Sequence, residues 1–75
     1  MRAKFKVDSV TTTEHSEILE FSAVCGKFNE AGDSEDNTYS KWTPTASLKM
    51  TVTNPALRGT IKPGEIFYLD FTKAQ

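Results

Sequence analysis

Residues 45–53 alternate strictly between polar and apolar side chains, and this pattern restricts the fold more than any other feature of the chain. Ala46, Leu48, Met50 and Val52 fall on one face, and threonine, serine and lysine side chains fall on the other. Side chains of a β-strand point alternately to opposite faces of a sheet, so a repeat of two predicts a strand with one buried face. Threonine is β-branched, which favours extended backbone on the polar face as well.

Three further segments have the pattern of strands: residues 2–10, 17–28 and 65–72. The polar run 11–16 separates the first from the second, so these two are expected to form an antiparallel hairpin. The last segment carries bulky side chains on both faces, which predicts a strand that lies centrally in the sheet or against a partner. The expected core-facing residues are Ala3, Phe5 and Val7 in the first segment, Leu19, Phe21, Ala23 and Cys25 in the second, and Phe67, Leu69 and Phe71 in the third.

Two short motifs predict where the chain turns. Asn54 suits a helix N-cap and Pro55 suits the first helical position, while Gly59 suits the position after a helix. We therefore expect a single helical turn here, with Leu57 anchoring it to the core. A proline and a glycine follow each other at 63–64, in the order that a type II turn requires.

Residues 29–44 follow no period and consist largely of loop-forming residues. Connections of this length are uncommon in compact domains and are often functional or mobile, so we expect a mobile acidic loop at about 29–38. The loop contains four acids: Glu30, Asp33, Glu35 and Asp36. Their spacing does not match an EF-hand, which needs acids at alternate positions followed by a fixed glycine and a distant glutamate. A solvated loop is therefore preferred to a metal site.

Together these elements predict a mainly β fold made of one domain, residues 1–75. The expected architecture is a small antiparallel β-barrel or half-barrel of four to five strands, with one short helical turn near 54–59. A last strand as apolar as 65–72 would be an adhesive edge, so we expect the sheet to close or the edge to be hidden by dimerisation. A core of this size leaves a stability margin of only a few kcal/mol, so homo-oligomerisation is retained as an alternative.

Charge and composition narrow the class of function. The net charge is −1, whereas domains that bind nucleic acid or anionic membranes are usually strongly basic. No apolar run approaches the roughly 18 residues that a membrane-spanning helix needs. The N-terminus alternates charged and apolar residues and so lacks the continuous apolar region of a secretory signal. We therefore expect an intracellular protein that does not associate with membranes.

No catalytic constellation is visible in the sequence. The single cysteine, Cys25, excludes an internal disulfide and a cysteine-based metal cluster, and its apolar segment predicts a buried side chain. The single histidine, His15, lies in a polar turn and is expected to be solvated. No nucleophile has a recognisable base, and no Gly-rich phosphate loop is present. We therefore expect no enzyme activity and no cofactor.

The first candidate site lies where the acidic loop meets the strand at 45–53. Tyr39, Lys41 and Trp42 are the expected partner-binding residues, together with Glu35 and Asp36. A tryptophan at this point either covers the core or contacts a partner, because it supplies a large contact area at little cost in entropy.

The second candidate site is a row of positive charges on the first strand. Arg2, Lys4 and Lys6 share one face and could follow phosphates, while Tyr68 could stack on a base. The alternative is that the cations protect a sheet edge or solvate an exposed face. Tyr68 and Asp70 share a face of the last strand, where they either bind a ligand through hydrogen bonds or are simply solvated.

Several short motifs resemble those of small, largely uncharacterised proteins encoded by tailed bacteriophages. The matching residues are 1–5 (Met-Arg-Ala-Lys-Phe), 35–39 (Glu-Asp-Asn-Thr-Tyr), 42–44 (Trp-Thr-Pro), Asn54-Pro55, Pro63-Gly64 and 70–72 (Asp-Phe-Thr). They cover most of the chain except 11–34. The resemblance implies a viral accessory protein that acts in the host cytoplasm or in the virion, and it brings no functional residue with it.

The leading hypothesis is a non-catalytic phage accessory protein that binds a macromolecular partner. That partner would be a host defence or regulatory component, or a virion protein. One alternative is a small barrel that binds single-stranded nucleic acid or a nucleotide. The other is a structural component of the virion.

Overall fold

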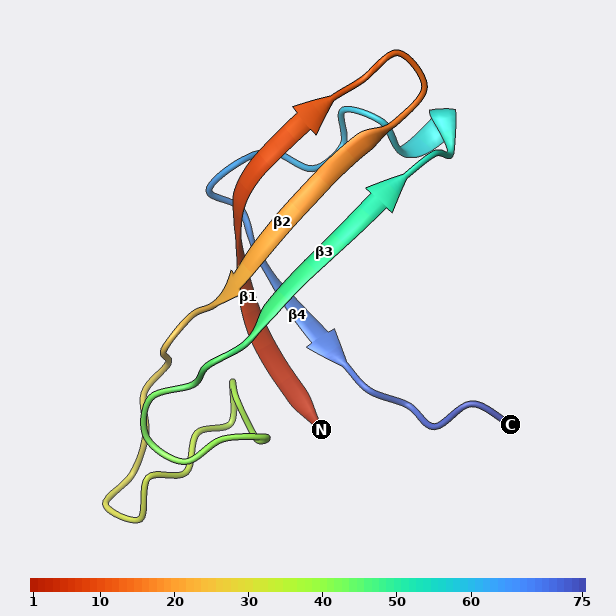
Figure 1. The fold of residues 1–75 in the computed structure, drawn as a ribbon. Coiled ribbons are helices and arrows are strands. Elements are labelled where there is room, and N and C mark those ends of the chain that lie inside the picture. Colours follow the sequence, from red (N-terminus) through yellow and green to blue (C-terminus); the bar gives the residue numbers. More distant parts are fainter.

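The computed structural model describes residues 1–75 and places four antiparallel strands in one sheet (Figure 1). The elements in chain order are β1 (Arg2–Thr12), β2 (Glu17–Ala23), β3 (Ser47–Val52), the 3₁₀ turn η1 (Pro55–Leu57) and β4 (Ile66–Asp70). No helix has the length and apolar character needed to cross a membrane.

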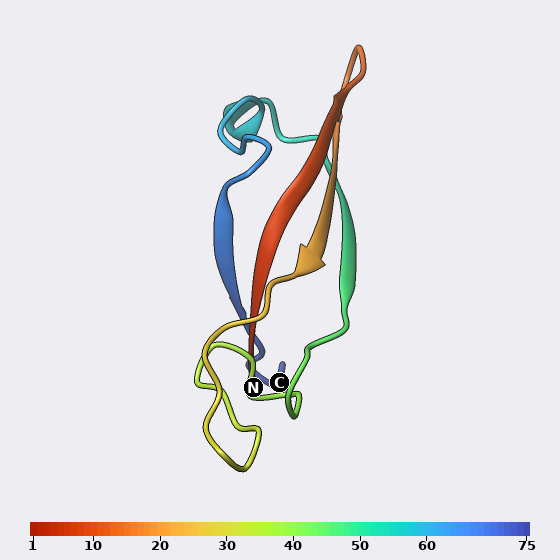
Figure 2. The ribbon, with the colours of Figure 1, turned by 90° about the vertical axis from the view of Figure 1, so that its left-hand side faces the viewer.

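The strands are arranged across the sheet in the order β3-β2-β1-β4. This is the order of a Greek key, in which the fourth strand returns to lie beside the first. The connection 53–65 carries the chain from one edge of the sheet to the other, across one end of the strands (Figure 2). The sheet curls, but β3 and β4 do not pair. The expected half-barrel is therefore confirmed. Of the two ways expected to hide the last strand, closure of the sheet or dimerisation, closure does not occur.

The core lies on the inner face of the curled sheet. Ala3, Phe5 and Val7 of β1 and Leu19 and Phe21 of β2 are buried there. The rings of Phe5 and Phe21 meet edge to face, with centroids 6.3 Å apart. The alternation of apolar residues therefore predicted correctly which face of the first two strands is buried.

A β-bulge in β1 changes which of its later side chains face inward. Val7 lies opposite Phe21 and Val10 lies opposite Leu19, so β1 has one more residue than β2 between these pairs. The extra residue lets Val10 join Val7 on the inner face and increases the local twist of the sheet.

Both predicted turns are present. Asn54 Oδ1 accepts a hydrogen bond from the Ala56 N–H at 3.0 Å and so caps η1. Gly64 has a φ of 88°, and the Glu65 N–H donates to the Lys62 carbonyl oxygen at 3.2 Å, as expected for a type II turn.

Three expectations about apolar residues are wrong. β2 ends at Ala23, and Cys25 beyond it is exposed rather than buried. Leu57 is 53% exposed, so η1 is held by its cap and not by a core contact. Phe67 and Phe71, expected to face the core, are 40% and 56% exposed. Of the two positions expected for this strand, central in the sheet or against a partner, the first is wrong, because β4 is an edge strand.

The common cause of these differences is the thinness of the molecule, whose smallest extent is 15 Å. An apolar sheet face is buried only when another layer of structure covers it. Figure 2 shows a single layer of strands, with the connection 53–65 at one end and residues 24–46 at the other. We call residues 24–46 the long loop, because it joins β2 to β3 without regular secondary structure.

Candidate protein-binding surface

The long loop is attached to β1 where β2 ends. Asn37 Oδ1 accepts a hydrogen bond from the Lys4 N–H at 2.9 Å, and Asn37 Nδ2 donates to the Val24 carbonyl oxygen at 2.8 Å. The Thr38 N–H donates to the Arg2 carbonyl oxygen at 2.9 Å, and Thr38 Oγ1 accepts from the Arg2 N–H at 2.8 Å. Backbone groups in a folded protein need hydrogen-bond partners. Asn37 is 2% exposed. Its side chain therefore supplies a hydrogen-bond partner for the β1 backbone where β2 has ended.

Charged side chains from three segments meet on the outer face of the sheet. Arg2 pairs with Asp70 through two contacts, Nε to Oδ1 at 2.7 Å and Nη2 to Oδ2 at 3.2 Å, and its guanidinium lies 4.5 Å from the centroid of the Tyr68 ring. Asp36 reaches over from the long loop. Its Oδ1 accepts from the Tyr68 hydroxyl at 2.7 Å, and its Oδ2 lies 3.3 Å from Lys4 Nζ. We call these five residues the outer-face cluster.

Hydrogen bonds within the outer-face cluster shift the pKa of its acids. The hydrogen bond from the Tyr68 hydroxyl, followed by that from Lys4, holds the pKa of Asp36 below its ordinary value of 3.8. The hydrogen bond from Arg2 likewise lowers the pKa of Asp70. The bond to Asp36 raises the pKa of Tyr68 above its ordinary value of 10.0. At neutral pH the cluster therefore contains two carboxylates, two cations and a neutral tyrosine.

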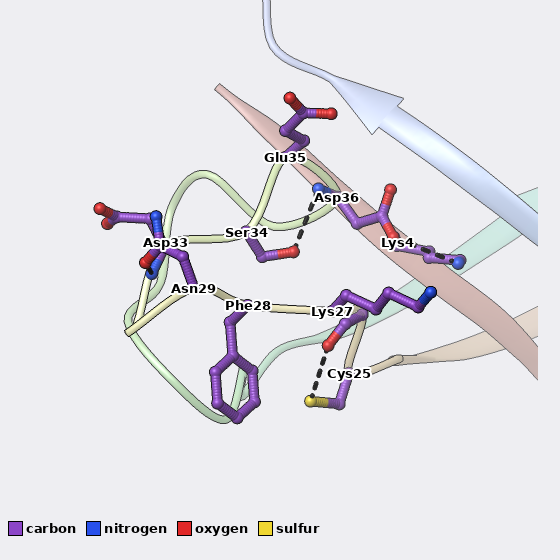
Figure 3. A pocket seen from close by; sticks show the side chains of 10 residues that line it. Lys4, Cys25, Lys27, Phe28, Asn29, Asp33, Ser34, Glu35 and Asp36 are labelled. Carbon is purple, nitrogen blue, oxygen red and sulfur yellow. Dashed lines mark hydrogen bonds and ion pairs between the residues drawn. The ribbon is translucent and has the colours of Figure 1, made fainter. Parts of the chain in front are cut away.

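An open polar hollow of about 910 Å³ lies between the long loop and β1 (Figure 3). Lys4 and Asp36 line it beside the Cys25 thiol, which lies 3.4 Å from the Gly26 carbonyl oxygen. The Glu35 side chain points away from the others. No group of three histidine, cysteine, aspartate or glutamate side chains is placed to hold a metal ion. The hollow thus contains the Lys4–Asp36 ion pair with the Cys25 thiol beside it.

A tight turn in the long loop supports the backbone and ring of Trp42. Asn29 Oδ1 accepts hydrogen bonds from the N–H groups of Ala31 and Asp33, both at 3.0 Å, and Gly32 has a φ of 84°. The Trp42 N–H donates to the Gly32 carbonyl oxygen at 2.8 Å. A Cβ atom on Gly32 would lie 2.7 Å from the Trp42 ring. The ring therefore rests directly on the glycine.

Trp42 also has a left-handed backbone conformation, with a φ of 59°. This conformation costs an L-amino acid about 1–2 kcal/mol. The surrounding structure must therefore hold the residue in place, and such strained residues are concentrated at functional sites. The Trp42 side chain is 52% exposed, so the strain does not serve to bury it.

Two neighbours complete the surface around this tryptophan. Phe28 is 45% exposed and meets Trp42 edge to face, with ring centroids 5.4 Å apart. Lys41 Nζ lies 2.6 Å from Asp33 Oδ1 and 3.3 Å from the Ala31 carbonyl oxygen. We call Phe28, Lys41 and Trp42 the Trp42 surface. It combines two exposed aromatic rings with a lysine that is ion-paired to Asp33.

The five residues expected to bind a partner are divided among different environments. Lys41 and Trp42 belong to the Trp42 surface, whereas Asp36 belongs to the outer-face cluster and Glu35 is exposed. Tyr39 packs against the core instead. Its hydroxyl oxygen is buried without a hydrogen-bond partner, and burial raises the pKa of this group.

The residues expected to contact phosphate do lie together. Arg2, Lys4 and Tyr68 all belong to the outer-face cluster, and β1 places Lys6 beside them on the same face. The charges of Arg2 and Lys4 are matched by carboxylates, however, and only Lys6 has no ion-pair partner. The row of positive charges seen in the sequence is therefore largely neutralised within the folded chain.

Three residues that shape the surface were not predicted from the sequence. Asn37 gives no local signal, because its partners lie 13 and 33 positions away along the chain. The sequence pattern predicts Phe28 at the end of a strand, although its alternation with the preceding residues is poor. Gly32 had the clearest signal, since a glycine among acids in a loop often marks a positive φ.

Comparisons with protein-family models, with curated proteins and with solved structures find no match to this chain. The geometry of the surface therefore carries the functional argument.

Proposed function

We propose that this protein is non-catalytic and acts by binding another protein through the Trp42 surface. The observation that carries this proposal is the conformation of Trp42, which is held in a strained backbone while its ring stays half exposed. A fold that needed Trp42 only as a core lid would bury the ring. Because the strained backbone does not bury the ring, the strain is better explained by a contact with another molecule.

The composition of the Trp42 surface suits a protein partner. Aromatic side chains dominate the binding energy of protein interfaces because they bury a large area at little cost in rotamer entropy. Phe28 and Trp42 supply such an area, and Lys41 is already held by Asp33, so little further ordering is needed on binding.

The resemblance to tailed-phage proteins supplies the biological setting of the proposal. In that setting the partner is a host defence or regulatory component, met in the host cytoplasm, or a virion protein. Binding of nucleic acid is less well supported, because Arg2 and Lys4 are paired with carboxylates and the net charge is −1.

Affinity capture from a lysate of the phage's bacterial host, with and without purified phage particles, tests this proposal. We expect the wild-type chain to retain a specific protein, and Trp42→Ala to retain it at least about tenfold less, as for an interface hot spot. Quantitative mass spectrometry of the bound fraction gives the ratio, and circular dichroism shows whether each variant is folded.

Leu57→Ala is the matched control. Leu57 has nearly the same exposure as Trp42, 53% against 52%. It belongs to η1, and the 3₁₀ turn lies at the opposite end of the sheet from the long loop (Figure 1). The Leu57→Ala variant should retain the partner as well as the wild type does. If folded Trp42→Ala captures the same proteins as the wild type and Leu57→Ala, the Trp42 surface does not bind a partner.

A further inference from the structure

We propose that two copies of this chain associate through the inner faces of their sheets, forming a two-fold dimer of half-barrels. The sheet has a charged outer face, and its inner face is apolar apart from Glu17, which is buried at one end and accepts a hydrogen bond from the Gly59 N–H. This is the pattern of one layer of a two-layer fold. The single chain provides only the first layer, and a second copy would provide the other.

The inner face continues well beyond the five buried core residues. Leu19 lies opposite Met50 of β3, and Phe5 lies opposite Phe67 of β4, so these side chains share the inner face with the core. Met50 and Phe67 are nevertheless 45% and 40% exposed, and Phe71 beyond β4 is 56% exposed. The apolar face is therefore covered at its centre by its own curl and left open along both edge strands.

A groove of about 200 Å³ runs along this face at the N-terminal end of β1. Apart from Ser47 and Tyr39, its lining is apolar and includes Phe5, Leu48, Leu69 and Phe71. No charged side chain lines it. An occupant must therefore present an uncharged, apolar surface of its own.

The area of the chain indicates how large the missing contact is. A folded monomer of 8.4 kDa is expected to expose about 4,600 Å², from the scaling of surface with mass. This chain exposes 5515 Å², an excess of about 900 Å². A standard protein interface buries about 800 Å² on each partner. The excess over the whole chain is similar in size to one partner's share of a standard interface.

A second copy satisfies the requirements of the groove and the area. In a two-fold dimer each chain offers the same patch, so an apolar face meets an apolar face of equal size. The charged residues Arg2, Lys4, Lys6 and Asp70 lie on the outer face, away from this contact, and the net charge of −1 gives little repulsion between copies. The Trp42 surface lies on the long loop, at the end of the sheet, and remains available for its own partner.

Sedimentation equilibrium with matched variants tests the dimer. We expect the wild type to have twice the 8.4 kDa chain mass at micromolar concentration. Phe67→Glu places an unpaired charge in the interface and should raise the dissociation constant by more than about 100-fold. Ile66→Glu is the control, since Ile66 is 53% exposed on the same strand but points to the outer face. It should leave the dimer intact.

A measurement on the wild type alone guards against a variant that does not fold. If folding is coupled to dimerisation, the urea midpoint rises with protein concentration. A wild type that stays monomeric at about 100 μM, with a midpoint independent of concentration, overturns the proposal. So does a dimer that survives Phe67→Glu, or one that Ile66→Glu dissociates equally, since the contact would then involve another surface.

Discussion

In the long loop, Trp42 is the non-glycine residue whose backbone conformation is strained. Its left-handed backbone is compensated by the hydrogen bond to Gly32 and by the contact of its ring with that glycine. A tryptophan in this conformation is maintained only while the turn beneath it keeps its shape. The position of the exposed ring therefore depends on the turn that contains Gly32.

The variant Gly32→Ala tests that support, with Gly64→Ala as its control. Both glycines have positive φ, 84° and 88°, but an added Cβ meets the Trp42 ring only at Gly32 and meets nothing within 4 Å at Gly64. Gly64→Ala should lower the free energy of unfolding by about 1–2 kcal/mol, the backbone cost alone. Gly32→Ala should lower it by about 2–4 kcal/mol, because the ring must also move.

Urea unfolding measures these losses, and the fluorescence of Trp42, the only tryptophan, reports the displacement of the ring. The emission spectrum should change in Gly32→Ala and not in Gly64→Ala. Equal losses with unchanged spectra would show that the turn does not position the ring.

Tyr39 is the opposite case, a buried polar group without a partner. Its hydroxyl loses hydration on folding and gains no hydrogen bond in return. Tyr39→Phe removes the hydroxyl but keeps the ring against the core, so the free energy of unfolding should rise by about 1 kcal/mol. Tyr68→Phe is the comparison, since it removes the hydrogen bond to Asp36 and should lower stability. A clear loss of stability in Tyr39→Phe would mean that its hydroxyl is hydrogen-bonded.

At the scale of elements, the long loop and β4 stabilise each other through the outer-face cluster. Tyr68 of β4 donates a hydrogen bond to Asp36 of the loop, and Asp70 of β4 pairs with Arg2 of β1. These two interactions hold the edge strand on its outer face. The bulk on both faces of β4 therefore has two causes: the inner residues are apolar, and the outer ones take part in this cluster.

This coupling predicts a dependence of stability on pH. The pKa of Asp36 is lowered by folding, so its contribution is fully present above its ordinary value of 3.8 and is lost as the pH falls through the lower folded value. The pKa of Tyr68 is raised, so its contribution is present below 10.0 and is lost as the pH rises through the higher folded value. Stability should therefore decline at both extremes.

Urea unfolding of Asp36→Asn at a series of pH values checks this prediction. The variant should be less stable than the wild type at pH 7 and should lose less stability below pH 3.8, because it has no carboxylate to protonate. Glu35→Gln removes the neighbouring charge, which forms no ion pair, and should follow the wild type. Parallel curves for wild type and Asp36→Asn would exclude Asp36 as the titrating group.

At the scale of the whole molecule, one layer of sheet buries only nine of 75 residues. Small domains already bury a modest fraction of their surface, and a single layer buries less. The proposed dimer adds the second layer, and it also displays two Trp42 surfaces on one particle. A partner with repeated sites would then bind by both, with an avidity above that of either contact alone.

The strands and turns of this fold were predictable because they depend on local properties. The alternation in β1, β2 and β3 sets the face of each side chain, and the turn at Gly64 follows from the order of proline and glycine. The sequence left two roles open for Trp42, covering the core or contacting a partner, and its exposed ring in the structure argues against the first. The docking of Asn37 was not predictable, because it depends on β1 backbone groups that β2 leaves without partners.

By itself the sequence determined a β fold, the inner faces of its strands and the positions of its turns, since each is written in residues that are close together along the chain. Only the tertiary structure decided that the sheet stays open, that β4 forms an edge, and that Arg2 and Lys4 are neutralised by Asp70 and Asp36. These outcomes depend on contacts between residues more than 30 positions apart, as the separations of 68 and 32 show for the two ion pairs. A local pattern does not specify which distant segments will contact each other. In this protein those contacts determine which surfaces remain available to a partner.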